Sequence, residues 1–177
     1  MTTQPIIESG MRFGLYSEEH CFHIEKSDLY QKIRENVKIA EFLLYRGIKD
    51  NQPIVWIVEA KSSSPQPSNQ LNFDNFIQEI QEKFFNTLLL YISIKLKRHD
   101  IPHQFSNLFQ DIDLKKTNFC FILVIKGHKE AWLPPLQDAL TKELRPIVKI
   151  WNLPPTAVVV LNDILAQELE LIQVDES

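Results

Sequence analysis

The chain has little cysteine: Cys21 and Cys120 are the only two in 177 residues. They show neither CxxC spacing nor a Cys/His pattern, which argues against a zinc site. Both stand in apolar, strand-like segments, where buried free thiols are common. In a reducing cytosol we therefore expect two unpaired thiols.

Long hydrophobic runs are also missing. No stretch approaches the roughly 18 uninterrupted apolar residues that a membrane span needs. The nearest candidate, residues 87–96, is too short and runs into Lys95, Lys97 and Arg98. The N-terminus (MTTQPIIESG) lacks the basic start and apolar run of a secretory signal. We therefore expect a cytoplasmic protein without a membrane partner.

Three common catalytic motifs are absent: a Gly-rich phosphate loop, a G-x-S-x-G elbow and a His-Glu-x-x-His helix. Their absence argues against nucleoside-triphosphate hydrolysis, serine hydrolysis and zinc proteolysis.

The chain also has no excess of basic residues, because it contains 19 Lys and Arg and 23 Asp and Glu, which gives a net charge of −4. This balance argues against a non-specific nucleic-acid coat protein but not against a nucleic-acid enzyme, whose metal-holding carboxylates add negative charge.

What is present favours one compact domain over residues 1–177, because 44% of the residues are hydrophobic. A Ser/Pro-rich loop at 62–68 is too short to divide two domains. Hydrophobic periodicity predicts strands at 21–25, 38–45, 54–60, 118–125 and 156–161. It predicts helices at 27–36, 73–98 and 131–151, and a last short helix capped by Asn162 or Asp163. This order predicts an α/β fold with a mixed central β-sheet flanked by helices.

Residues 38–61 are the most informative segment. Two apolar strands, KIAEFLLY and IVWIVEA, are joined by RGIKDNQP, a connection typical of a β-hairpin. With the turn centred near residue 50, antiparallel pairing places Glu41 across from Glu59. Strand side chains alternate between faces, so Glu59 and Lys61 share a face while Ala60 points away. Glu41, Glu59 and Lys61 are therefore expected to converge on one patch.

Two carboxylates facing each other across a strand pair repel, and burial adds a desolvation cost. A hard divalent cation would compensate, because carboxylates are the ligands that Mg²⁺ prefers. Lys61 beside the metal could orient or deprotonate a water, or neutralise charge developing on a phosphate. The three residues therefore predict a metal-dependent site that acts on phosphate esters.

Three features resemble the PD-(D/E)xK nuclease superfamily: the acid in KIAEFLLY, the Glu-Ala-Lys that ends the next strand in IVWIVEAKSS, and the long helix that follows. The resemblance covers roughly residues 20–125. The resemblance implies a restriction-endonuclease-like fold. It implies that Glu41 and Glu59 bind Mg²⁺ or Mn²⁺, that the Ala60 carbonyl adds a metal ligand, and that Lys61 assists the attacking water. The implied function is hydrolysis of a phosphodiester bond in nucleic acid, DNA in the first place.

Two features depart from that family's pattern. Ala40-Glu41 stands where the family usually has Pro-Asp, and no helix that supplies a further glutamate is visible before Cys21. Three glutamates could replace that missing acid: Glu18, Glu19 and Glu25. On the long helix Gln78 or Gln81 weakly matches a family glutamine, while Glu79, Glu82 and Lys83 are expected on its polar side.

Several alternatives stay open on the sequence alone. The chain could be a catalytically inactive nuclease-fold module for binding or assembly, or its substrate could be RNA, and its formation of a homo-oligomer is undecided. His20 and His23 could bind a transition metal, although a surface pair is the simpler reading. The basic segments 95–98 and 115–116 could contact phosphates or could be solvated.

Overall fold

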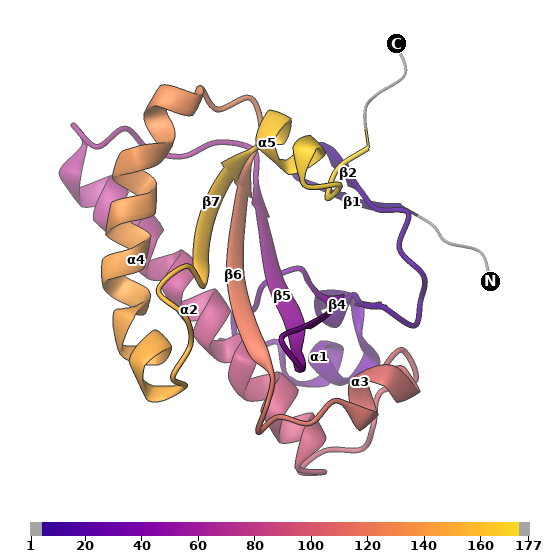
Figure 1. Cartoon of the computed structure of the whole chain (residues 1–177). Helices are drawn as coiled ribbons and strands as arrows, with labels where there is room; N and C mark the ends of the chain where they lie inside the picture. Colours follow the sequence, from indigo (N-terminus) through magenta and orange to yellow (C-terminus); the bar gives the residue numbers. More distant parts are fainter. Residues whose placement is uncertain (1–4, 174–177) are drawn as a thin grey trace.

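A computed structural model describes residues 5–173. Its centre is a five-stranded sheet with the strand order β3-β4-β5-β6-β7 (Figure 1). Strand β4 is antiparallel to β3 and β5, whereas β5, β6 and β7 run parallel to one another. The predicted α/β fold with a mixed central sheet and flanking helices is confirmed.

The sheet strands are β3 (Cys21–Phe22), β4 (Phe42–Lys49), β5 (Gln52–Lys61), β6 (Asn118–Ile125) and β7 (Val158–Asn162). Strands β1 (Ile6–Glu8) and β2 (Met11–Phe13) form a separate hairpin. The helices are α1 (Asp28–Ile33), α2 (Gln70–Lys95), α3 (Asn107–Asp111), α4 (Leu133–Ile150) and α5 (Asp163–Glu168), with two 3-10 turns, η1 (Ile24–Lys26) and η2 (Glu130–Trp132). None of the helices within residues 5–173 combines the length and the apolar character that a membrane span requires.

Both faces of the sheet are covered. On one face, Val55 and Ile57 of β5 belong to a core shared with α2 and α4. On the other face, Val58 and Ala60 belong to a second core shared with β1, β2 and α5. Figure 1 shows α2 and α4 on one side of the sheet and the β1–β2 hairpin with α5 near its other side. Strands that are buried on both faces explain why 42–45 and 54–60 are almost wholly apolar.

The β4–β5 hairpin turns at Asp50 and Asn51, whose φ angles of 52° and 62° suit a tight two-residue turn. The predicted turn near residue 50 is therefore confirmed, but the strand limits differ. Strand β4 begins at Phe42 rather than at residue 38, because the Ala40 amide donates to Thr87 Oγ1 on α2 instead of joining the ladder. It also continues to Lys49, so most of the predicted connection RGIKDNQP is strand.

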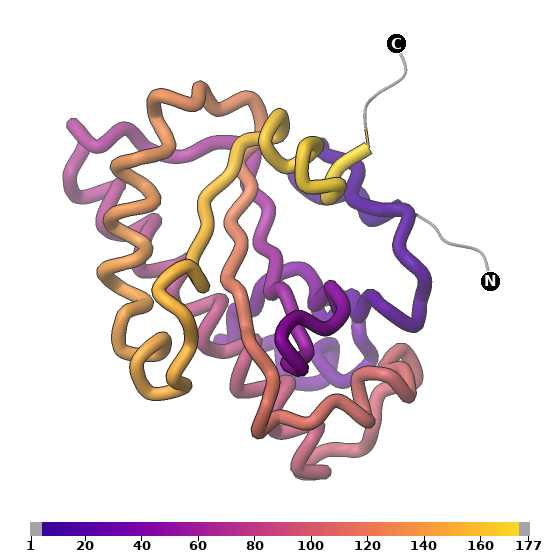
Figure 2. The backbone as a smooth tube through the Cα atoms, in the orientation of Figure 1, coloured from indigo at the N-terminus to yellow at the C-terminus, as the bar shows by residue number. Residues whose placement is uncertain are grey.

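The N-terminal segment, which the sequence left without predicted structure, packs beside the end of the described chain (Figure 2). The Gly14 amide donates to the Leu171 carbonyl, and the Gln173 amide donates to the Arg12 carbonyl. The predicted strand 21–25 is shorter than expected: after Phe22 the chain turns into the 3-10 helix η1. Residues at both ends of the described chain thereby help to cover the second face of the sheet.

Several details of the helices follow from capping side chains. Ser27, Asn69 and Asn162 accept hydrogen bonds at the N-termini of α1, α2 and α5. On α4, the side-chain amide of Gln137 lies against the free edge of β7. Its Nε2 donates to the Val158 carbonyl and its Oε1 accepts from the Val160 amide, at 2.9 and 2.8 Å.

Candidate functional site

Glu59 and Lys61 occupy the carboxyl end of β5, on the face that packs against α2. Glu59 is fully buried, with no exposed surface, and Lys61 is half-buried. Ala60 points to the opposite face and belongs to the second core. The predicted alternation of side chains along this strand is therefore confirmed.

Helix α2 brings two charged side chains to this end of β5. Lys83 Nζ lies 2.7 Å from Glu59 Oε1, while Lys61 Nζ lies 3.4 Å from the same oxygen. Lys61 also donates to Glu79 Oε1 at 2.9 Å, and this hydrogen bond holds the pKa of Glu79 below its usual value. Burial alone would lower the pKa of Lys83, but the carboxyl groups of Glu59, Glu41 and Glu25 together outweigh burial and raise it. Glu59 is therefore neutralised chiefly by a lysine of α2.

Glu41 stands directly before β4. Its amide donates to the Val58 carbonyl at 3.0 Å, and continuing the Phe42–Val58 register places it next to Glu59. Only 6% of its surface is exposed, and within residues 5–173 no lysine, arginine or histidine forms an ion pair with its carboxylate. Burial, the neighbouring Glu25 carboxyl and the Glu59 charge raise the pKa of Glu41 to about 9.

Glu41 is part of a compact group of four side chains with Glu8, His23 and Glu25, hereafter the Glu₃His cluster. One potential ligand atom from each residue lies within 4.8 Å of those of the other three. Glu8 ends β1, His23 precedes η1 and Glu25 lies within η1, so three separate segments build the cluster. Glu59 is not one of its members.

The Glu₃His cluster contains one of the upstream glutamates that the sequence analysis considered. Of the three glutamates considered upstream of β4, Glu25 joins Glu41, whereas Glu18 and Glu19 are not in the cluster. Glu8 was not predicted at all, because the three-residue strand that carries it has no recognisable hydrophobic period. The only sequence signal for His23 was its position three residues after His20.

His23 and His20 have different surroundings. The Nε2 atom of His23 is buried without a hydrogen-bond partner in the described chain and lies 3.5 Å from Glu8 Oε1. Burial lowers the pKa of His23 to about 4, so its imidazole is neutral at pH 7. His20, by contrast, is exposed, shares a hydrogen bond with Ser17 Oγ and stacks on Tyr45. The two histidines therefore do not act as a pair.

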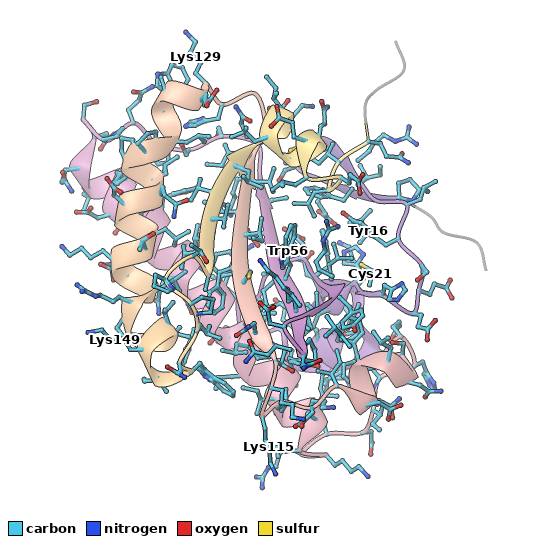
Figure 3. The ribbon with its side chains drawn as sticks, viewed as in Figure 1. Tyr16, Cys21, Trp56, Lys115, Lys129 and Lys149 are labelled. Carbon is cyan, nitrogen blue, oxygen red and sulfur yellow. The ribbon has the colours of Figure 1, made fainter. Side chains whose placement is uncertain are left out.

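A pocket of about 500 Å³ opens beside the cluster. Glu8 and His23 line it together with Tyr16, Cys21 and Lys26. Figure 3 shows Tyr16 and Cys21 near each other on the side of the molecule that carries the N-terminal segment. Burial raises the pKa of the Cys21 thiol to about 12, so this cysteine is not a thiolate at neutral pH. The pocket gives small molecules and ions a route to the Glu₃His cluster.

Other residues singled out from the sequence lie outside the Glu₃His cluster. The Ala60 carbonyl, expected from the resemblance to bind metal, accepts a hydrogen bond from Ser9 Oγ at 3.0 Å. Gln78 is exposed on α2. In the basic segment 95–98, Lys95 donates to the Gln110 and Ile112 carbonyls.

The site combines three features: buried carboxylates in excess of nearby cations, a neutral imidazole, and two lysines at the carboxyl end of a central strand. Carboxylate and imidazole groups bind divalent metal ions, and lysines can stabilise anionic substrates. Comparison of the chain with protein-family models, with curated proteins and with solved structures gave no match.

Proposed function

We propose that the protein hydrolyses phosphodiester bonds in nucleic acid, DNA in the first place, with a divalent metal ion bound at the acidic end of β5. The observation that carries this proposal is the Glu41 carboxyl group. It is almost fully buried, has no cationic partner in the described chain and lies beside the carboxyl groups of Glu25 and Glu59. Such an arrangement is costly unless protons or a cation compensate for it.

A divalent ion bound there would lower the pKa of a coordinated water and neutralise charge on a phosphate. Glu41 and Glu25 would hold the ion, with Glu59 at its inner side. In the reaction the water oxygen bonds to phosphorus and loses its proton, one ester P–O bond breaks, and the departing oxygen takes up a proton. The role proposed for the protein is to orient the water and to hold the phosphate in the path of attack.

Lys61 is the side chain best suited to meet the phosphate. It lies beside Glu59 but retains some exposure, and its ammonium group is shared between Glu59 and Glu79. A phosphate could draw it away from the half-exposed Glu79. Lys83, more deeply placed, pairs with Glu59, opposes the rise in the Glu59 pKa that burial causes, and holds the carboxyl group in position. This division of roles follows the resemblance to PD-(D/E)xK nucleases, including the restriction-endonuclease-like arrangement that it implies.

The alternative function is a binding or assembly module on an inactive nuclease fold. One observation favours it: Lys61 and Lys83 are both already paired with carboxylates, as in a purely structural network. Such a module needs no ion, so Mg²⁺ or Mn²⁺ should leave its thermal stability unchanged. The nuclease should instead be stabilised by the ion, because a ligand that binds only the folded state raises the free energy of unfolding.

The direct test is cleavage of plasmid, linear duplex and single-stranded DNA, and of RNA, with Mg²⁺, Mn²⁺ or EDTA. Glu59→Ala and Lys61→Ala should each lower the metal-dependent rate on the order of a hundredfold or more. Lys149→Ala is the matched control, since Lys149 is exposed near the C-terminal end of α4 (Figure 3). Wild-type cleavage by Lys61→Ala would refute the proposed mechanism.

A further inference from the structure

We infer that the Glu₃His cluster of Glu8, His23, Glu25 and Glu41 is a binding site for a transition-metal ion, Mn²⁺ being the ion to test. The inference rests on the proposed function in that it identifies the metal of the same site. It differs from the expectation drawn from the sequence, which placed the ion on Glu41, Glu59 and the Ala60 carbonyl. The argument uses the positions of ligand atoms, the unpartnered buried atoms and the chemistry of imidazole.

The ligand atoms are already gathered. One ligand atom of each of the four side chains lies within 4.8 Å of the others, although the residues come from β1, from η1 and the residue before it, and from the segment before β4. Three carboxyl groups in this space repel one another when they are ionised, so that protons or a cation must compensate for their charge. Within the described chain, the only basic side chain paired with them apart from His23 is Lys26, which lies 3.7 Å from Glu8 and 3.6 Å from Glu25 and is largely exposed. Lys26 forms no ion pair with Glu41.

Two buried atoms of the cluster lack partners. Glu41 Oε2 and His23 Nε2 are both shielded from solvent without a hydrogen bond in the described chain. A buried polar atom without a partner costs about 1–3 kcal/mol, and such atoms are rare in folded proteins. Glu41 is itself more than nine-tenths buried. A metal ion between these residues would satisfy both atoms at once.

The histidine sets the class of ion. Mg²⁺ prefers oxygen ligands and retains several waters, whereas Mn²⁺ and later divalent metals also accept imidazole nitrogen. A set of three carboxylates and one imidazole therefore favours a transition metal. Glu59 is outside the cluster: Lys83 holds its Oε1 at 2.7 Å, while its buried Oε2 has no hydrogen-bond partner in the described chain.

The site would also join the N-terminal hairpin to the sheet. Glu8 is the last residue of β1, and the next two residues are anchored near it: Ser9 Oγ donates to the Ala60 carbonyl and Lys126 Nζ donates to the Gly10 carbonyl. These contacts place Glu8 without help from the ion. The pocket lined by Glu8 and His23 provides the entry path.

The test is electron paramagnetic resonance of the full chain with Mn²⁺. Loss of the free-ion signal gives the dissociation constant, and electron spin-echo modulation detects a directly bound ¹⁴N nucleus. We expect about one high-affinity Mn²⁺ per chain, ¹⁴N modulation, and Mg²⁺ competing only at concentrations tenfold or more higher. His23→Ala should raise the Mn²⁺ dissociation constant about tenfold or more and remove the modulation. His20→Ala, in an exposed histidine three residues earlier, should change neither.

The possible results separate this inference from the proposed function. Tight Mn²⁺ binding without ¹⁴N modulation would refute the role of His23 but leave a carboxylate-bound metal and nuclease activity standing. Absence of binding by both Mn²⁺ and Mg²⁺ would overturn both proposals. If His23→Ala does not fold, Glu8→Gln and the wild-type modulation decide the matter: unchanged Mn²⁺ affinity in Glu8→Gln would contradict the four-residue site.

Discussion

Lys83 Nζ lies 2.7 Å from Oε1 of Glu59, a carboxylate with no exposed surface. Removing one member of a buried ion pair leaves the other uncompensated, at a cost of about 3–5 kcal/mol. Lys83→Met should therefore lower the free energy of unfolding by about that amount. Urea denaturation at pH 7, with EDTA present, measures the change.

Lys61→Met provides the comparison for Lys83→Met. Lys61 retains some exposure and lies farther from Glu59, so its loss should cost no more than about 1 kcal/mol. Equal destabilisation by the two substitutions would contradict this prediction, because it would show that the buried and the partly exposed ion pair contribute equally to the free energy of unfolding.

The second prediction concerns Glu41. Because its carboxyl group is buried without a cationic partner, Glu41→Gln should raise the stability of the metal-free protein at neutral pH by about 1 kcal/mol or more. The same substitution should weaken stabilisation by Mg²⁺ or Mn²⁺. Thermal melts with EDTA and with millimolar metal measure both effects. Glu82→Gln, an exposed acid on α2, is the control; a large, metal-independent loss of stability in Glu41→Gln would indicate a structural role instead.

The third prediction is a pH dependence. The pKa of Glu41 is about 9 in the folded protein against an ordinary value of 4.5, so the folded state binds the proton more tightly than the unfolded state. The contribution of this group to stability is therefore fully present below about pH 4.5 and is lost as the pH rises towards 9. Between about pH 6 and 8 the loss should approach about 1.4 kcal/mol per pH unit, and it should level off above pH 9.

The measurement is the difference in unfolding free energy between the wild type and Glu41→Gln across pH 6–9, without metal. Subtracting the variant removes the contributions of other titrating groups, including His23. Metal binding must displace the Glu41 proton, so metal affinity should rise over the same range. A pH-independent difference would mean that Glu41 is already ionised in the metal-free protein.

The sequence predicted the centre of the fold better than its borders. The alternation of β5 follows from a local period of two, so the shared face of Glu59 and Lys61 was predictable. The tight turn at Asp50 then placed Glu41 beside Glu59, although the strand itself begins one residue later. By contrast, the sequence gave no sign that Thr87 of α2 would take up the Ala40 amide.

The site residues that the sequence did not predict are brought into place by long-range packing. Lys83 and Glu79 stand at the border of the apolar face of α2, and only the way the helix docks decides that they meet β5 rather than solvent. Glu8 and His23 come from strands of two and three residues or the turns beside them, which are too short for a periodic signal. Their meeting with Glu41 is a property of the tertiary structure alone.

The final prediction concerns Gln137, whose side chain occupies the outer edge of β7. Gln137→Leu should change monomer stability little but should increase concentration-dependent aggregation. Light scattering during prolonged incubation, with Gln78→Leu on the exposed side of α2 as a control for added hydrophobicity, measures this. Equal scattering by both variants would count against a special role for this edge.

The consequence of the Gln137 contact is that the sheet ends without offering a template for another chain. An amide side chain offers one hydrogen-bond donor and one acceptor, as a peptide group does. The Gln137 amide bonds to the Val158 carbonyl and the Val160 amide, two backbone groups that a further strand would otherwise pair with. The opposite border, β3, has only two residues and offers almost no ladder to extend. A protein with such an apolar central sheet thus protects its two borders differently, one by shortness and the other by a side chain that imitates backbone.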